Sequence, residues 1–254
     1  MAYERDIGVL AITDHDTVAG HDEAIATGAA LGVRILRGIE ISALSEEGKE
    51  VHVLGYGVQP SDEATRTRIE SLRDVREARA KALLSKLSSL GITISFERVK
   101  AFAGDGMIGR PHVARAMVEA GVVRTVNQAF DEYLGEGKAG FVSHEGLTPQ
   151  QAVALIHRAH GAAVLAHPML YKGNLDGLLQ DSIAAGLDGI EAFYPSHTPE
   201  QTQIFVRLAE KQGLVVTGGS DFHGPIGDLE VSLGTISLPH DAIPKLDARI
   251  QNYK

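Results

Sequence analysis

Residues 8–16 of the chain read GVLAITDHD, an apolar run that ends in three potential metal-binding side chains. The apolar run predicts a buried β-strand. A helical pattern over residues 18–31 follows and is closed by Gly32, after which a second apolar run covers residues 33–36. A strand, a helix and a second strand in succession are typical of a βα unit, so the stretch predicts an α/β fold.

Other apolar runs of the chain also lead into side chains that bind metals. Glu40 follows the second run, His167 follows residues 162–165, and Asp221 and His223 come after the run over residues 214–217. A carboxylate or imidazole at the end of a strand is held by the sheet and open to solvent, as in the active sites of α/β folds. We therefore expect a metal-dependent hydrolase.

Composition limits the kinds of protein and of site. The chain has 254 residues with 44% hydrophobic and 22% charged side chains, so it can bury a core of its own. It contains 11 histidines and no cysteine, which excludes disulfides, thiolate zinc sites and cysteine nucleophiles. The net charge of −9 argues against sequence-independent binding of duplex DNA but allows a small phosphorylated substrate in a locally positive pocket.

The sequence shows neither a membrane span nor a signal peptide. A span would need about 18 consecutive apolar residues, and the first six residues, MAYERD, lack a basic and then apolar pattern. We therefore expect a cytoplasmic protein without a membrane partner. The oligomeric state is left open by the sequence.

Residues 61–140 break the alternation of strands and helices. Helical patterns dominate this section, with a long charged helix over residues 62–90, another over 110–121 and a third over 126–134. We interpret 61–140 as an inserted helical subdomain, and residues 1–60 together with 141–254 as the main α/β domain. Such an insertion could supply substrate contacts.

Three side chains of this section are candidates for binding a phosphate. Arg110 and His112 open a helix, and Lys138 follows the next one. Guanidinium, imidazole and ammonium groups all donate hydrogen bonds to phosphate oxygens. The alternative is that each is solvated surface.

Clustered divalent ions would explain why His, Asp and Glu recur at these strand ends. Hydrolysis of a phosphate ester at neutral pH needs an activated water and a counter-charge for the phosphate oxygens, and such ions supply both. Mn is the ion we expect, with Zn or Fe as alternatives. Glu40 could bridge two ions with its two oxygens, and His52 alternates out of another apolar run toward the same site.

Six segments together resemble one known family, the polymerase and histidinol phosphatase (PHP) metal-dependent phosphoesterases, and within it the nucleotide phosphatase branch. The resemblance covers nearly the whole chain, and the segments occur in family order. They are residues 13–17, 38–42, 52–56, 109–112, 165–168 and 219–224.

The resemblance implies a distorted (βα)7-type barrel of parallel strands with helices outside and a small helical insertion. It implies up to three divalent ions, with Glu40 shared between two of them. It also implies hydrolysis of phosphomonoesters such as AMP or 3′,5′-bisphosphonucleotides, and in some members 5′ to 3′ trimming of short RNA. The implied metal ligands are His15, Glu40, His52, His167, Asp221 and His223.

On the substrate side the resemblance implies roles for Arg110, His112 and His197. Arg110 would neutralise phosphate oxygens while an activated water attacks phosphorus, without a covalent intermediate. The leaving oxygen would take its proton from His197 or from water, and the sequence does not choose between them.

One departure from the family opens alternatives. Family members begin with a strand that carries a His-x-His pair, whereas only seven residues precede Gly8 here and none is a histidine. The first family strand is therefore expected to be missing, either because Met1 is an internal start of an ordinary enzyme, which we favour, or because the protein is a degenerate, weak or inactive nucleotide-binding member. A third alternative is an amidohydrolase-type enzyme acting on a carbon–nitrogen bond.

Several single residues have structural interpretations. Asp14 or Asp16 could cap the following helix, and His144 is interpreted as loop surface. Glu191 lies in an apolar run and could support a ligand histidine or face solvent. The remaining histidines that we interpret as packed or surface residues are His21, His157, His160 and His240.

Overall fold

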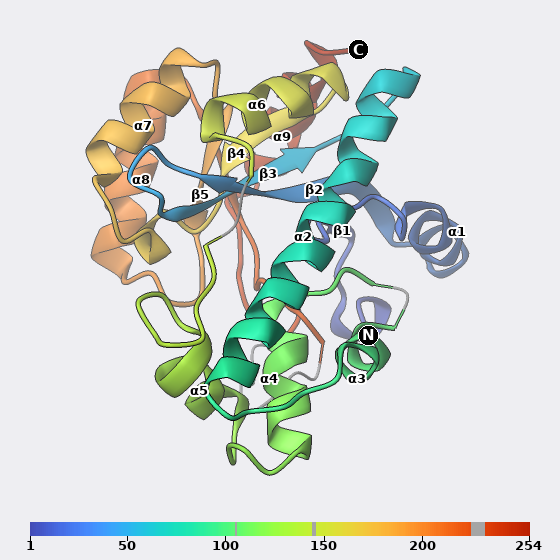
Figure 1. The fold of residues 1–254 in the computed structure, drawn as a ribbon. Coiled ribbons are helices and arrows are strands. Elements are labelled where there is room, and N and C mark those ends of the chain that lie inside the picture. Colours follow the sequence, from blue (N-terminus) through green and yellow to red (C-terminus); the bar gives the residue numbers. More distant parts are fainter. Residues whose placement is uncertain (105, 144–145, 225–231) are drawn as a thin grey trace. The chain divides into compact units, whose positions relative to one another are not determined.

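The computed structural model describes residues 1–104, 106–143, 146–224 and 232–254 (Figure 1). His144 therefore lies outside the described residues. The chain forms two compact units, and the long helix α2 (Glu63–Ser89) runs from one into the other. The first unit comprises Met1–Ile69, Gly146–Phe222 and Val231–Lys254, and the second comprises Glu70–Glu145 and His223–Glu230.

The first unit is built on one curled sheet, a half-barrel, in which the described strands lie side by side in sequence order. The pairs β1–β2, β4–β5 and β5–β6 are parallel, as the βα pattern predicts. The strands are β1 (Val9–Ile12), β2 (Arg34–Leu44), β3 (Glu50–Tyr56), β4 (Ala162–Leu165), β5 (Gly189–Phe193) and β6 (Val215–Gly218).

Strand β3 departs from the parallel arrangement that the family resemblance implies. It runs antiparallel to both β2 and β4. The reason is the connection, because β2 and β3 are joined by a short hairpin in which Ser45 N–H donates to Lys49 O at 2.9 Å. A parallel neighbour would need a longer crossover, usually a helix.

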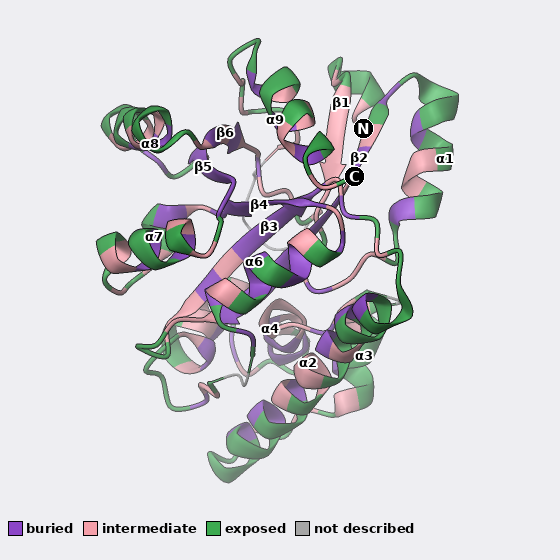
Figure 2. Cartoon of the chain, turned by 90° about the horizontal axis from the view of Figure 1, so that it is seen from above, coloured by how far each residue is buried: buried purple, intermediate pink, exposed green. Residues whose placement is uncertain are grey.

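Helices cover the sheet of the first unit, and each of them has buried residues on part of its surface (Figure 2). Helix α6 contacts β3, α8 contacts β5 and α9 contacts β6. Capping boxes begin α6 and α8, in which Thr148 and Thr198 exchange hydrogen bonds with the residue three positions later. The helices are α1 (His21–Leu31), α6 (Pro149–Arg158), α7 (Leu175–Ala184), α8 (Pro199–Gln212) and α9 (Ala242–Gln251).

Helix α1 begins later than the sequence pattern predicts. Its N-cap is Gly20, without a side-chain cap, so the interpretation of Asp14 or Asp16 as the cap was wrong. Asp16 is instead buried, and its Oδ1 accepts a hydrogen bond from the N–H of Ser42 on β2 at 2.9 Å. A contact from the turn after β1 to strand β2 is therefore formed in place of the local cap.

The second unit is helical and has its own apolar core. Besides α2 it contains α3 (Phe96–Ala103), which the sequence pattern did not reveal, and α4 (Arg110–Glu119). The single helix predicted over 126–134 is divided into a short α5 (Val126–Ala129) and a π-helical turn. Fully buried members of this core include Leu83, Leu87, Val99, Val113, Met117 and Leu134. The predicted limits of the insertion stay a prediction.

The long helix α2 is highly charged, and among the described residues no helix combines the length and the hydropathy that a membrane crossing requires.

Candidate metal centre

The segment after β1 brings His15 beside Glu40. The chain continues along β2 beyond the end of β1, and His15 pairs with Glu40 in a parallel bridge. Asp16 N–H donates to Glu40 O at 2.9 Å, and Glu40 N–H donates to Asp14 O at 3.1 Å. These backbone bonds fix the imidazole and the carboxylate in neighbouring positions.

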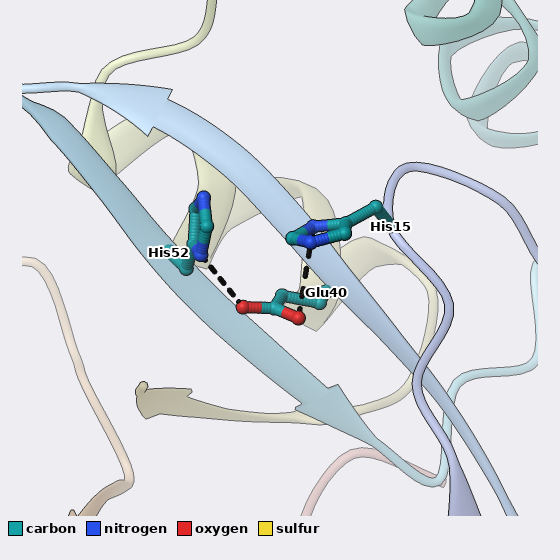
Figure 3. A group of neighbouring side chains, drawn as sticks. All are labelled: His15, Glu40 and His52. Atoms are coloured by element: carbon teal, nitrogen blue, oxygen red, sulfur yellow. Dashed lines mark ion pairs between the residues drawn. The ribbon is translucent and has the colours of Figure 1, made fainter. Parts of the chain in front are cut away.

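The β2–β3 hairpin adds His52 to the pair. Glu40 lies opposite Leu54 and Ser42 lies opposite His52, so His52 and Glu40 are diagonal neighbours in the antiparallel ladder. His52 Nδ1 is 2.8 Å from Glu40 Oε1, and His15 Nδ1 is 3.6 Å from Oε2. Figure 3 shows the two imidazoles approaching different oxygens of one carboxylate.

The end of β4 delivers a third imidazole. Ala166 N–H donates to His52 O at 3.1 Å, which aligns the following residue with β3. His167 Nε2 lies 3.1 Å from His52 Nδ1 and 3.2 Å from Glu40 Oε1. The structure therefore brings together four of the six predicted ligands, namely Glu40 and the three imidazoles around it.

The converging atoms suit a divalent cation. Metal–ligand bonds of about 2.1 Å at right angles put neighbouring ligand atoms about 3 Å apart, close to the separations among Glu40, His52 and His167 of 2.8, 3.1 and 3.2 Å. The candidate ligand atoms of His15, Glu40 and His52 all lie within 4.8 Å of one another. A set of nitrogen and oxygen donors without thiolate suits Mn, Zn or Fe.

The buried carboxylate of Glu40 carries the charge that would attract a cation. Glu40 is only 4% exposed, and burial raises its pKa, but His15, His52 and His167 together hold it well below its usual range. Burial lowers the pKa of His52, whereas Glu40 and Glu50 raise it to about 10. The carboxylate is thus charged at neutral pH, and a metal ion would compete with the His52 proton.

Asp221 follows β6 and is connected to this group by Tyr194. The hydroxyl of Tyr194 donates to Asp221 Oδ2 at 2.9 Å, and its ring centroid lies 5.4 Å from that of His167. Asp221 has a φ of +52°, and His167 has a φ of +25°. Positive φ in residues other than glycine costs free energy and is concentrated at functional sites.

His197, the predicted proton donor, is separated from His167 by the ring of Tyr194. Its ring centroid is 5.3 Å from that of Tyr194, and its Nδ1 is 3.0 Å from Ala192 O. Because a carbonyl only accepts, Nδ1 carries the hydrogen and the buried Nε2 is the unprotonated atom. Burial lowers the pKa of His197, which keeps the ring neutral. Its catalytic role stays a prediction.

The other predicted site residues belong to the second unit. The Arg110 guanidinium lies 5.8 Å from the ring centroid of Phe130, and His112 Nδ1 accepts the N–H of Gly109 at 3.0 Å. Burial, together with nearby Arg115, Arg76 and His223, lowers the pKa of His112. Lys138 and His223 are exposed. The roles of Arg110, His112, Lys138 and His223 stay predictions.

Tyr194 was not selected from the sequence, and Glu191 was left open between supporting a ligand histidine and facing solvent. Glu191 is 4% exposed, so the solvent-facing interpretation was wrong, and its Oε2 accepts the N–H of His167 at 2.8 Å. Burial is the main cause that raises the pKa of Glu191 to about 8, and nearby Glu40 and Asp221 add to it. An acidic residue inside an apolar strand was the signal for Glu191, whereas nothing local marked Tyr194.

Comparison with models of known protein families found no match. Individual proteins do match over nearly the whole chain. A 5′-3′ exoribonuclease of Haemophilus influenzae is 37% identical over 96% of this chain and 89% of its own length. A 3′,5′-nucleoside bisphosphate phosphatase of Chromobacterium violaceum is 36% identical over 98% of this chain and 90% of its own length.

Solved structures match as well. An amidohydrolase from Chromobacterium violaceum, with bound sulfate and no metal, has a TM-score of 0.87 and 35% identity, covering 98% of this chain and 88% of that one. A structure from Bifidobacterium adolescentis, provisionally described as a metal-dependent phosphoesterase, has a TM-score of 0.86 and 31% identity over the same shares of the two chains.

Proposed function

This chain belongs to the PHP-type metal-dependent phosphoesterases, which are hydrolases, and we propose that it removes phosphate from small nucleotides such as 3′,5′-nucleoside bisphosphates and AMP. The observation that carries the proposal is the convergence of imidazoles from different strand ends on the buried Glu40 carboxylate. The name of the Chromobacterium violaceum phosphatase supports the substrate class.

The proposed ions are Mn²⁺, up to three per chain, held by His15, Glu40, His52, His167, Asp221 and His223. When bound, such ions supply positive charge for the phosphate oxygens and lower the pKa of water. Sulfate has the shape and charge of a phosphate group, so its presence in the solved Chromobacterium violaceum relative is in keeping with a phosphate substrate. A cytoplasmic location completes the proposal.

The residues of the chain itself would bind and orient the substrate. Glu40 supplies a fixed negative charge at the centre of the site. In the second unit, Arg110, His112 and Lys138 are proposed to donate hydrogen bonds to phosphate oxygens. His197 is proposed to accept or return a proton at its Nε2, because Nδ1 is committed to Ala192 O.

A second candidate substrate is short RNA, which the Haemophilus influenzae relative favours. The two activities differ in their products. A phosphatase releases inorganic phosphate from a 3′,5′-bisphosphate, whereas a 5′ to 3′ exonuclease releases mononucleotides from RNA one at a time. The same centre could serve both, since each reaction breaks a phosphate ester.

The test is incubation with adenosine 3′,5′-bisphosphate, AMP and a short 5′-phosphorylated RNA in Mn²⁺, with the products separated by chromatography. We expect phosphate release that chelation abolishes. Glu40→Gln should lower the rate on the order of 1000-fold, while Glu46→Gln, the same change at an exposed hairpin position, should leave it unaltered. No product from any of the three, or hydrolysis of an amide substrate instead, would contradict the proposal.

A further inference from the structure

Strand β5 carries none of the predicted metal ligands, yet it contacts two of them. From the strand itself, Glu191 accepts the backbone N–H of His167 at 2.8 Å. From the residue just after the strand, Tyr194 donates its hydroxyl hydrogen to Asp221 Oδ2 at 2.9 Å. His167 follows the neighbouring strand on one side of β5, and Asp221 follows the neighbouring strand on the other.

Both contacted residues have unfavourable backbone conformations. His167 has φ +25° and ψ +60°, and Asp221 has φ +52°. The strain at His167 is increased by Pro168, because a residue before proline favours an extended backbone. Such conformations persist only where the surroundings hold them, and the buried Glu191 carboxylate bonds to the N–H of the strained His167 itself.

The local shape of β5 is adapted to these contacts. The pairing of β5 with β6 is irregular between Glu191 and Phe193, where the register shifts. A bulge of this kind re-aims the side chains around it and is common beside active sites. Glu191 and Tyr194 lie on either side of the irregularity, so it sets where each of them points.

We propose that β5 is the support strand of the metal centre, in which Glu191 positions the His167 imidazole through its backbone N–H and Tyr194 positions the Asp221 carboxylate. Both are positioning residues that act through a ligand. The inference rests on the proposed function only in requiring that His167 and Asp221 bind the cation.

The experiment measures Mn²⁺ affinity of the full chain by electron paramagnetic resonance, which detects free Mn²⁺ and does not depend on activity. Glu191→Leu removes the acceptor, Glu191→Gln retains an oxygen acceptor, and Tyr194→Phe removes the hydroxyl while keeping the ring. Supporting residues of metal ligands typically contribute 10–100-fold to affinity. We expect a loss of about that size in Glu191→Leu, about 10-fold in Tyr194→Phe, and substantial rescue in Glu191→Gln.

Asp188→Asn is the matched control. Asp188 is also buried and directly precedes β5. It accepts the backbone N–H of Ala163, near the start of β4, at 2.8 Å, whereas His167 follows the end of β4. This variant should lose stability and keep its Mn²⁺ affinity. If Glu191→Leu does not fold, Tyr194→Phe, whose ring still fills the partly exposed site, tests the support of Asp221, and an unchanged Mn²⁺ affinity in this variant would overturn the proposal.

Glu40→Gln tests the metal centre separately from the support role of β5. Tight Mn²⁺ binding that survives Glu40→Gln would contradict the proposed metal centre itself. Binding that is lost in Glu40→Gln but unchanged in folded Glu191→Leu and in Tyr194→Phe would overturn the support role of β5 alone. Equal losses in Glu191→Leu and Asp188→Asn would also overturn it, because they would indicate a general effect of destabilisation.

Discussion

Glu191, in the middle of β5, and Asp188, directly before the strand, are two buried carboxylates that form the same backbone contact with opposite electrostatic results. Each accepts an N–H from the neighbouring β4 segment at 2.8 Å, Glu191 from His167 and Asp188 from Ala163. Burial raises the pKa of Glu191 to about 8, and nearby carboxylates add to it. Burial also acts to raise the pKa of Asp188, but its hydrogen-bond partners outweigh it and lower the pKa.

The difference lies in what surrounds each carboxylate. Around Asp188, His157 Nε2 lies 2.9 Å from one oxygen, and the Tyr253 hydroxyl donates to the other at 2.9 Å. Arg249 adds a further donor at 3.4 Å. The protein thus neutralises Asp188 with its own groups, whereas Glu191 lies near two other acidic side chains, Glu40 and Asp221. At one end of the β4–β5 pair the carboxylate is paired within a structural network, whereas the other end brings acidic side chains together without such partners around Glu191.

The largest expected effect is at the acidic end. Glu40→Gln should abolish measurable Mn²⁺ binding, because an amide is a poor metal ligand and cannot bridge two ions as a carboxylate does. Calorimetric titration with Mn²⁺ measures this directly. A dissociation constant within about threefold of that of the unchanged chain would contradict the proposed difference between the acidic end near Glu191 and the neutralised end at Asp188.

At the neutralised end we expect loss of stability without loss of metal binding. Asp188→Asn removes the charge that His157 and Arg249 face, which should lower the free energy of unfolding by roughly 2–4 kcal/mol. Urea unfolding of the metal-free protein measures the change. A destabilisation below about 0.5 kcal/mol would mean that the network contributes far less than its contacts suggest.

The same carboxylate should make stability depend on pH. Because the folded pKa of Asp188 is lower than its usual value, the ionised form stabilises the fold above the unfolded pKa of about 3.9, and this contribution is lost as pH falls through the folded pKa. The stability difference between the unchanged chain and Asp188→Asn should therefore be largest near neutral pH and shrink below about pH 4. A difference that grows on acidification would have the wrong sign.

The smallest effect concerns a single donor of the network. Tyr253→Phe removes the hydroxyl that Asp188 accepts but keeps the ring, which stacks on His157 with centroids 4.4 Å apart. Arg249 still reaches the same oxygen, so the cost should be about 1 kcal/mol. Thermal unfolding of Tyr253→Phe and of Asp188→Asn compares the two losses of stability. A loss in Tyr253→Phe as large as that in Asp188→Asn would contradict the smaller contribution assigned to the Tyr253 hydroxyl.

Much of the first unit follows from local sequence signals. The apolar runs located the strands, and Gly32 marked the end of α1. The grouping of Glu40 with His52 and His167 followed from the rule that strand ends share an edge, together with the family resemblance. The histidine at 157 was also interpreted correctly as structural, since it bonds to Asp188.

The features that were missed depend on contacts between distant segments. Asp16 has a side chain typical of a helix cap, but its carboxylate instead accepts the N–H of Ser42 on β2. Tyr194 acquires its role only because β6 places Asp221 beside it. Helix α3 has a cap signal at Ser95, but it is a short element without a long repeating pattern. No local signal encodes such pairings, since they arise when the sheet assembles.

The most direct test of the metal centre is a crystal structure of the Mn²⁺-soaked protein with anomalous scattering measured to locate the ion. The account predicts a strong anomalous peak about 2.1–2.3 Å from Glu40 Oε1, His52 Nδ1 and His167 Nε2. Anomalous peaks found only elsewhere on the protein, with these three side chains still hydrogen-bonded to one another, would contradict it.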